Sequence, residues 1–118
     1  MIYESGENYL EAILKLSKKG ERLLAVDIAR ELGVSKPSVT RAIKVLADKG
    51  FLINESKNIR LTDAGQKIAN EIAIRHETIT GFLVKFGVSE QVAAKDACRI
   101  EHYISPETFA AIERAVNN

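Results

Sequence analysis

The stretch that decides the fold is LAVDIARELGVSKPSVTRAIKVLADKG, residues 24–50 of the 118-residue chain. Apolar residues recur at helical spacing up to Gly33, and a second apolar stripe follows the glycine. Ser35 is a residue type that caps helix N-termini, and Pro37 falls in the first turn, where no helical N–H is lost. Two short helices joined by a tight turn predict a helix-turn-helix, and Gly50 ends the second helix.

Small and apolar residues around the turn sharpen this prediction. Ala29 is small enough for the helices to approach, and Gly33 takes the turn. We expect Val34 and Val39 to fill the angle between the helices, and Val26 to join the apolar face of the first. An ordinary helical hairpin would not need these residues, so the pattern favours a DNA-binding motif.

A β-hairpin is predicted directly after the motif. Phe51–Glu55 and Ile59–Leu61 are short apolar runs on either side of a polar tip. A hairpin after a recognition helix is a wing, and Lys57 at its tip is placed to reach a phosphate. Thr62 or Asp63 is suited to cap the next helix.

Helices are predicted on both sides of the winged motif. Apolar periodicity places them over residues 5–18, about 63–86, 89–103 and 106–116. The predicted fold class is therefore mainly α, with a winged helix-turn-helix followed by a helical region.

Composition indicates a folded chain from a reducing compartment. Hydrophobic residues make up 46%, enough for a core without disulfides, and Cys98 is the only cysteine. No apolar run approaches the ~20 residues that cross a bilayer, and the start MIYESGENYL lacks the order of a secretory signal. We expect a cytoplasmic protein with no membrane contact.

The formal net charge of +1 hides an asymmetry. Residues 18–60 carry ten Lys and Arg against five Asp and Glu, whereas residues 89–118 carry three against five. A basic segment joined to an acidic one suggests polyanion contact at one end and cation binding at the other.

Hydroxyl and basic side chains occupy the start of the second helix of the motif, which in such motifs enters the major groove of DNA. Arg41 can donate two hydrogen bonds to a guanine, and Pro37 can contact a thymine methyl, whereas lysines suit phosphates. A single lysine is more simply a solvated charge, but a set along one face favours DNA binding. The predicted DNA-binding residues are Ser35, Lys36, Pro37, Ser38, Thr40, Arg41, Lys44 and Lys57.

A second cluster of functional side chains lies in DACRIEH, residues 96–102. Cys98, Glu101 and His102 are spaced i, i+3 and i+4, which puts them on one face of a helix. Thiolate, carboxylate and imidazole suit a divalent transition metal better than magnesium or calcium. Three ligands are too few, so other helices must contribute. The candidates there are His76, Asn8 and Glu11.

Spacing alone leaves a metal site and an inert helix face equally open, because a lone helical cysteine is often a small buried hydrophobe. A Cys–His nucleophile pair is the catalytic alternative. It would need an oxyanion hole, and no glycine-rich turn lies near Cys98. We therefore expect no enzymatic activity.

Five segments carry a family resemblance: GENYLEAILKL, DIARELGVSKPSVTRAIKVLADKGF, LTDAGQKIA, RHETITGFL and DACRIEH. Together they resemble the diphtheria toxin repressor family of iron- or manganese-dependent transcriptional regulators. The resemblance implies a DNA-binding domain over residues 1–62 and a helical metal-binding and dimerisation domain over 63–118. It also implies a homodimeric repressor of palindromic operator DNA that uses Fe(II) or Mn(II), for which Co(II), Ni(II) or Zn(II) can substitute.

The resemblance also assigns the metal ligands. Cys98, Glu101 and His102 match the family's main metal cluster, with Cys98 as in iron-type members, and His76 matches the histidine of the neighbouring site. Glu11 matches a glutamate ligand of manganese-type members.

Other positions depart from the family pattern. Asn8 stands where the family usually has Asp or Met, and Thr80 and Ala94 stand where iron-type members have further ligands. The chain also stops before the SH3-like domain of the larger members, so we expect the short form.

Two alternatives stay open. One is a winged-helix regulator of another type, which senses a small molecule or binds DNA constitutively with no metal dependence. The other is a dimeric interaction module whose helix-turn-helix is a scaffold. Metal dependence tests the first, and salt-dependent DNA binding tests the second.

Overall fold

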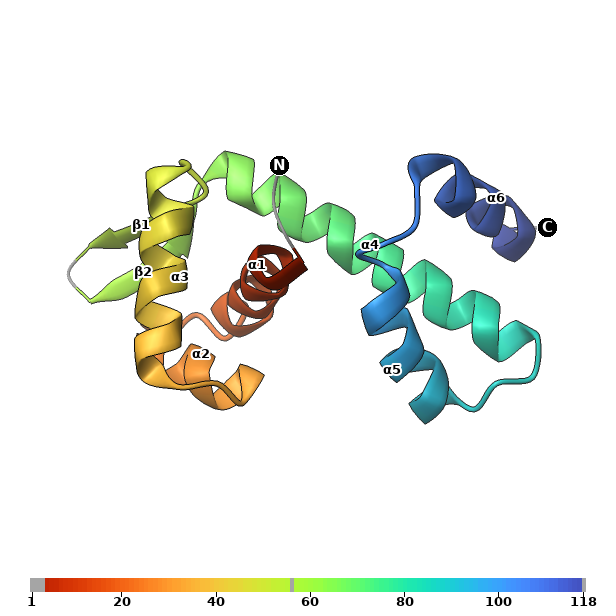
Figure 1. The fold of residues 1–118 in the computed structure, drawn as a ribbon, viewed down its shortest axis with the longest axis horizontal. Coiled ribbons are helices and arrows are strands. Elements are labelled where there is room, and N and C mark those ends of the chain that lie inside the picture. The colour runs from red at the N-terminus through yellow and green to blue at the C-terminus, as the bar shows by residue number, and fades with distance from the viewer. Residues whose placement is uncertain (1–3, 56, 118) are drawn as a thin grey trace. The chain divides into compact units, whose positions relative to one another are not determined.

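The computed structural model describes residues 4–55 and 57–117 (Figure 1). The mainly α fold with one two-stranded sheet confirms the predicted fold class. The chain divides into two compact units, Met1–Asn70 and Glu71–Asn118. The elements are α1 (Glu4–Ser17), α2 (Ala25–Leu32), α3 (Lys36–Asp48), β1 (Leu52–Glu55), β2 (Asn58–Leu61), α4 (Asp63–Lys85), α5 (Glu90–Ile100) and α6 (Pro106–Asn117).

The helix-turn-helix forms as predicted from local signals. Gly33 adopts a left-handed conformation at φ 68°, and its N–H donates to the Ala29 carbonyl over 2.9 Å. The Ser35 hydroxyl accepts a hydrogen bond from the Ser38 N–H over 3.2 Å, which caps α3. Val39 is fully buried, so the start of α3 is anchored to the core of the first unit.

Two of the predicted core residues are instead exposed. Val34 is 40% exposed, and its N–H closes the turn on the Ala29 carbonyl while its side chain stays at the surface. Val26 is 43% exposed because it lies two residues before the buried Ile28, and such residues point to opposite sides of a helix. The prediction that these two valines are buried was therefore wrong.

The core of the first unit is built from one apolar face of each helix and from the hairpin. Helix α1 contacts α2, α3 and β2, and α3 contacts β1. Fully burying one such side chain contributes about 1.5–3 kcal/mol. The buried aliphatic side chains of this unit include Leu10, Ile13, Leu23, Ile28, Val39, Ile43, Leu46, Leu52 and Ile59.

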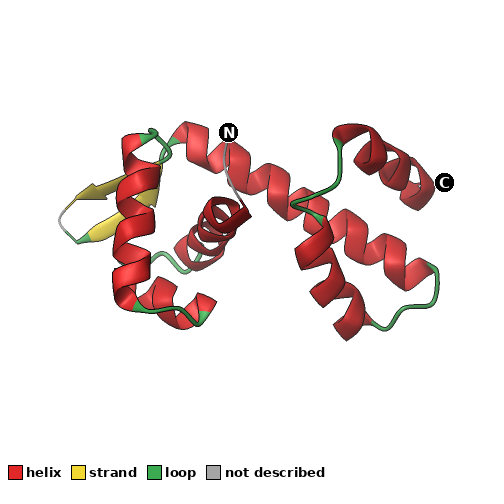
Figure 2. Cartoon of the chain, in the orientation of Figure 1, coloured by secondary structure: helices red, strands yellow, loops and turns green. Residues whose placement is uncertain are grey.

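The predicted wing is a short antiparallel hairpin beside α3 (Figure 2). Its register pairs Leu52 with Leu61 and Glu55 with Asn58. Lys57 turns the chain in the left-handed region at φ 56°, whereas Ser56 of the predicted tip lies outside the described residues.

A second set of contacts fixes the wing to the rest of the unit. The Ile59 N–H donates to the Leu23 carbonyl over 2.9 Å, and the Leu23 N–H donates to Asn58 Oδ1 over 3.1 Å. These two bonds hold the base of the hairpin against the segment that leads into α2.

The start of α4 is locked to the turn after α3. The Thr62 hydroxyl donates to the Gly50 carbonyl over 2.6 Å and accepts from the Gly65 N–H over 3.1 Å, so Thr62 is the predicted cap. A Cβ at Gly65 would overlap the backbone carbonyl of Phe51. Only glycine therefore allows this close approach.

The second unit comprises the remainder of α4 with α5 and α6. Ser89 caps α5 by accepting the Val92 N–H over 3.4 Å, and Ala93 and Ala97 are fully buried. Helix α5 ends at Ile100, earlier than the predicted Tyr103, and residues 101–103 form turns. The described residues contain no helix long and apolar enough to cross a membrane.

Candidate metal centre and nucleic-acid interface

The predicted DNA-reading surface lies along the exposed side of α3. Ser38 is half-buried, and the other predicted positions on this surface are exposed. A chain of hydrogen bonds runs along it, with the Ser35 and Ser38 hydroxyl oxygens 2.8 Å apart and Arg41 Nη2 donating to Ser38 Oγ over 3.3 Å. The exposed members are Ser35, Lys36, Pro37, Thr40, Arg41 and Lys44.

These hydrogen bonds hold the Arg41 side chain near the start of α3. The Thr40 hydroxyl is less available, because it donates to the Lys36 carbonyl over 3.1 Å. The surface thus offers one oriented guanidinium and two lysine ammonium groups to a polyanion.

A shallow hollow adjoins this surface at the base of the wing. Its volume is about 400 Å³, and two lysines, Lys36 from α3 and Lys57 from the wing, share it with apolar side chains. Leu24 and Val26 belong to it and are exposed, although the sequence placed Val26 in the core. The amphipathic pattern of α2, read by strict i, i+4 spacing from Ile28, would have shown that Val26 faces outward.

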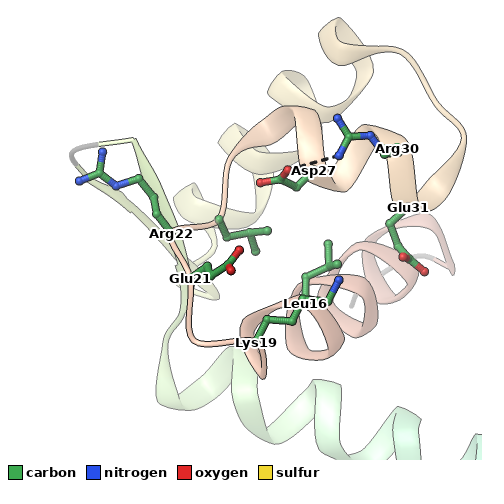
Figure 3. A pocket seen from close by; sticks show the side chains of 8 residues that line it. Leu16, Lys19, Glu21, Arg22, Asp27, Arg30 and Glu31 are labelled. Atoms are coloured by element: carbon green, nitrogen blue, oxygen red, sulfur yellow. Dashed lines mark ion pairs between the residues drawn. The ribbon is translucent and has the colours of Figure 1, made fainter.

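A second hollow of about 360 Å³ lies between the end of α1 and α2 (Figure 3). Arg30 and Asp27 form an ion pair of 3.7 Å there, and Arg22 extends away from that pair. Its basic and acidic side chains are equal in number, so it does not favour a polyanion. They are Lys19, Arg22, Arg30, Glu21, Asp27 and Glu31.

In the second unit, the side chain of Glu101 lies between two imidazoles. Its Oε2 is 3.0 Å from His76 Nδ1, and its Oε1 is 3.4 Å from His102 Nε2. The Glu101 and His102 side chains have no exposed surface, whereas that of His76 is 31% exposed. The structure thus brings together three of the predicted ligands, from α4 and from the turn after α5.

This donor set fits a divalent transition metal. The buried carboxylate and the two imidazoles beside it offer oxygen and nitrogen donor atoms, which iron, manganese and zinc accept as ligands. Burying a carboxylate costs free energy unless it is paired with polar or cationic groups. The two imidazoles beside Glu101 are such polar groups.

Cys98 is placed differently from Glu101 and His102. It is exposed on α5, whereas Glu101 is the C-cap of that helix, with helical backbone angles, and His102 lies in the turn that follows. Among the described residues, no group of three His, Cys, Asp or Glu ligand atoms within 4.8 Å of one another includes Cys98. Its role as a ligand stays a prediction.

Asn8 and Glu11 lie on α1, in the first unit, and are both half-buried. Their spacing of three residues puts them on the same side of that helix. Their role as ligands also stays a prediction.

An open hollow of about 550 Å³ lies beside His76 in the second unit. Thr80 and Ala94, which stand at the family's further ligand positions, both line it. The Thr80 hydroxyl is buried and has no hydrogen-bond partner within residues 4–55 and 57–117. Neither position supplies a carboxylate or an imidazole.

Two family models match the chain. Residues 1–58 match the N-terminal DNA-binding domain of iron-dependent repressors, and residues 62–118 match their metal-binding and dimerisation domain.

Individual proteins are similar over most of the chain. The transcriptional regulator MntR of Salmonella typhimurium is 38% identical over 106 residues, which cover 89% of this chain and 68% of that protein. An uncharacterised HTH-type transcriptional regulator of Methanocaldococcus jannaschii is 36% identical over 113 residues, which cover 93% of this chain and 90% of that protein. The apo structure of the manganese-activated repressor ScaR is 27% identical with a TM-score of 0.80. That match covers 92% of this chain and 53% of ScaR, so this chain spans about half of its length.

Proposed function

Because the chain belongs to the iron-dependent repressor family, we propose that it is a metal-dependent transcriptional repressor that binds palindromic operator DNA as a homodimer. The observation that carries this function is the buried Glu101 carboxylate, which lies between His76 and His102. The exposed basic surface of α3 would bind the operator DNA. We place the protein in the cytoplasm, where it has access to DNA, and expect no enzymatic activity.

We propose that residues 1–62 form the DNA-binding domain and residues 63–118 the metal-binding and dimerisation domain. The matched ranges of the two family models support this division. Several large apolar side chains of the second unit are exposed and suit burial against a second copy of the chain. These are Ile74, Val84, Phe86, Val92 and Tyr103.

Glu101, His102 and His76 would hold the metal, and we assign Cys98, Glu11 and Asn8 to the same ligand set. When bound, Fe(II) or Mn(II) would supply a divalent charge that needs ligands from several helices at once. Glu101 and His102 come from the turn after α5, and His76 comes from α4. The protein's own contribution is a buried donor set with its carboxylate already oriented.

The regulatory step is a shift between conformations of the dimer. The two α3 helices must be separated by one helical turn of DNA to read two half-sites. A conformation with that separation is favoured by any ligand that binds it more tightly than the alternatives. Metal and DNA then each raise the affinity of the protein for the other.

The test is DNA affinity measured by fluorescence anisotropy across Mn(II), Fe(II), Co(II) and Zn(II). The probe is a duplex selected from a random pool in the presence of Mn(II). We expect at least one metal to strengthen binding by about 5- to 150-fold over protein in chelator. Equal affinity in every metal and in chelator would favour the metal-independent winged-helix regulator.

A further inference from the structure

Arg75, which precedes the ligand His76 on α4, directs its guanidinium to the turn after α5 in the second unit. Its Nη1 donates to the Glu101 carbonyl over 3.0 Å and to the Ile104 carbonyl over 3.4 Å. Both carbonyls lie in the segment that follows the end of α5 at Ile100. Arg75 supplies a hydrogen-bond donor to both from a different helix.

Two consecutive residues of α4 therefore hold the two ends of Glu101. The Glu101 backbone carbonyl accepts from Arg75, and its side-chain carboxylate lies 3.0 Å from His76. The backbone position of Glu101 is thus fixed independently of the carboxylate. His102, the next residue, lies on the same turn.

The same guanidinium also contacts α6. Its Cζ lies 5.3 Å from the centroid of the Phe109 ring, which is within the range of a cation–π interaction. The described residues of α6 include no buried one, and Lys85 Nζ of α4 donates to the Ala115 carbonyl over 3.0 Å. Arg75 therefore joins α4, the ligand-bearing turn and α6.

We propose that Arg75 is a positioning residue of the metal centre, which presents Glu101 and His102 by holding the turn that carries them. This inference rests on the proposed function. Arg75 itself cannot be a ligand, because a guanidinium has donors only.

Removing Arg75 would have two opposite effects on metal affinity, one through its charge and one through its hydrogen bonds. A positive charge close to the Glu101 carbonyl repels a divalent cation, so its loss alone would strengthen metal binding. Loss of the two hydrogen bonds frees the turn and would weaken metal binding. The sign of the change therefore separates the two effects.

The experiment compares R75M with wild type by Co(II) titration against a competing chelator. We expect R75M to bind Co(II) about tenfold more weakly, as is typical when a residue that orients metal ligands is removed. The matched control is R99M, because Arg99 is exposed on α5 and has no hydrogen bond or ion pair within the described part of the chain. We expect R99M to bind as tightly as wild type or slightly more tightly.

Two conservative variants extend the test. R75K keeps the charge but lacks the planar fork, and we expect it to recover only part of the lost affinity. F109L removes the ring under the guanidinium and leaves both hydrogen bonds, and we expect a loss of about twofold. If R75M fails to fold, the Co(II) affinities of R75K and F109L test the positioning role of Arg75 instead.

A metal-free measurement adds a readout that the bound ion cannot influence. In the apo protein, R75M should accelerate hydrogen exchange at the Tyr103 and Ile104 amides, which donate to the Ile100 carbonyl. Wild-type exchange there, or Co(II) affinity equal to or above wild type, would overturn the positioning role. Absence of Co(II) binding by the wild type would overturn the metal centre itself, and this inference with it.

Discussion

The surface of α3 and the cluster around Glu101 are both predicted to bind charged partners, but they are built in opposite ways. The α3 side chains are mostly exposed, so water and salt screen each charge. The Glu101 carboxylate is fully buried and meets only a few groups, each at short range. Binding at α3 is therefore spread over many weak contacts, whereas around Glu101 it depends on a few side chains at short range.

The substitution with the largest expected effect on metal binding is E101Q. The amide keeps the shape of the side chain but cannot act as an anionic ligand, and we expect Co(II) and Mn(II) affinity to fall at least about a hundredfold. The control is E113Q, because Glu113 is an exposed acid on α6, and its affinity should stay at the wild-type value. Equal metal affinity of E101Q and wild type would remove Glu101 from the site.

The two glycines of α4, one in each unit, are expected to change the free energy of unfolding in opposite directions when replaced by alanine. A Cβ at Gly65 would overlap the Phe51 carbonyl, so G65A should lower the free energy of unfolding by about 2–3 kcal/mol. A Cβ at Gly81 has no neighbour within 4 Å, so G81A should raise it by up to about 1 kcal/mol. Urea denaturation measures both. A similar small effect of the two substitutions would show that the start of α4 does not need its close approach to Phe51.

The sequence predicted the fold where local signals decide it. The cap at Ser35, the left-handed Gly33 and the buried Val39 follow from residue type and spacing alone. The end of α5 does not follow from local signals. The carbonyls of the turn beyond it accept hydrogen bonds from Arg75, which is distant in sequence. Helical periodicity continues past Ile100 in the sequence, whereas in the structure Arg75 holds the turn that follows.

The candidate metal site was predicted in part for the same reason. Residue types identified Glu101, His102 and His76, which the structure places together. The i, i+3, i+4 spacing added Cys98, whose role as a ligand stays a prediction, and the structure places Glu101 at the C-cap of α5 and His102 in the turn beyond it. Burial of the Glu101 carboxylate could not be read from the sequence, because it depends on packing between elements.

On the α3 surface, the substitution with the largest expected effect is R41A. Arg41 is oriented by Ser38, so its loss should weaken binding to a selected duplex by about 1–3 kcal/mol and binding to random DNA much less. K44A is the matched control and should weaken both equally, as a phosphate contact does. Equal losses for R41A on both duplexes would reduce Arg41 to a phosphate contact.

A smaller effect on metal binding is expected at Cys98, the exposed member of the predicted ligand set. If its thiolate is a ligand, C98A should weaken Co(II) binding by about tenfold and remove the sulfur-to-cobalt charge-transfer absorption. The ultraviolet–visible spectrum of the Co(II) complex reports this directly. A wild-type complex without that absorption would leave the buried carboxylate and imidazoles as the site.

Metal and DNA are proposed to favour the same state of the protein, and one thermodynamic cycle measures their coupling. DNA affinity is determined with and without Mn(II), and Mn(II) affinity is determined with and without the selected duplex. Both ratios should exceed one and agree, because the coupling free energy is reciprocal. A ratio of one on both sides, with metal and DNA each bound, would show that the two sites are not coupled.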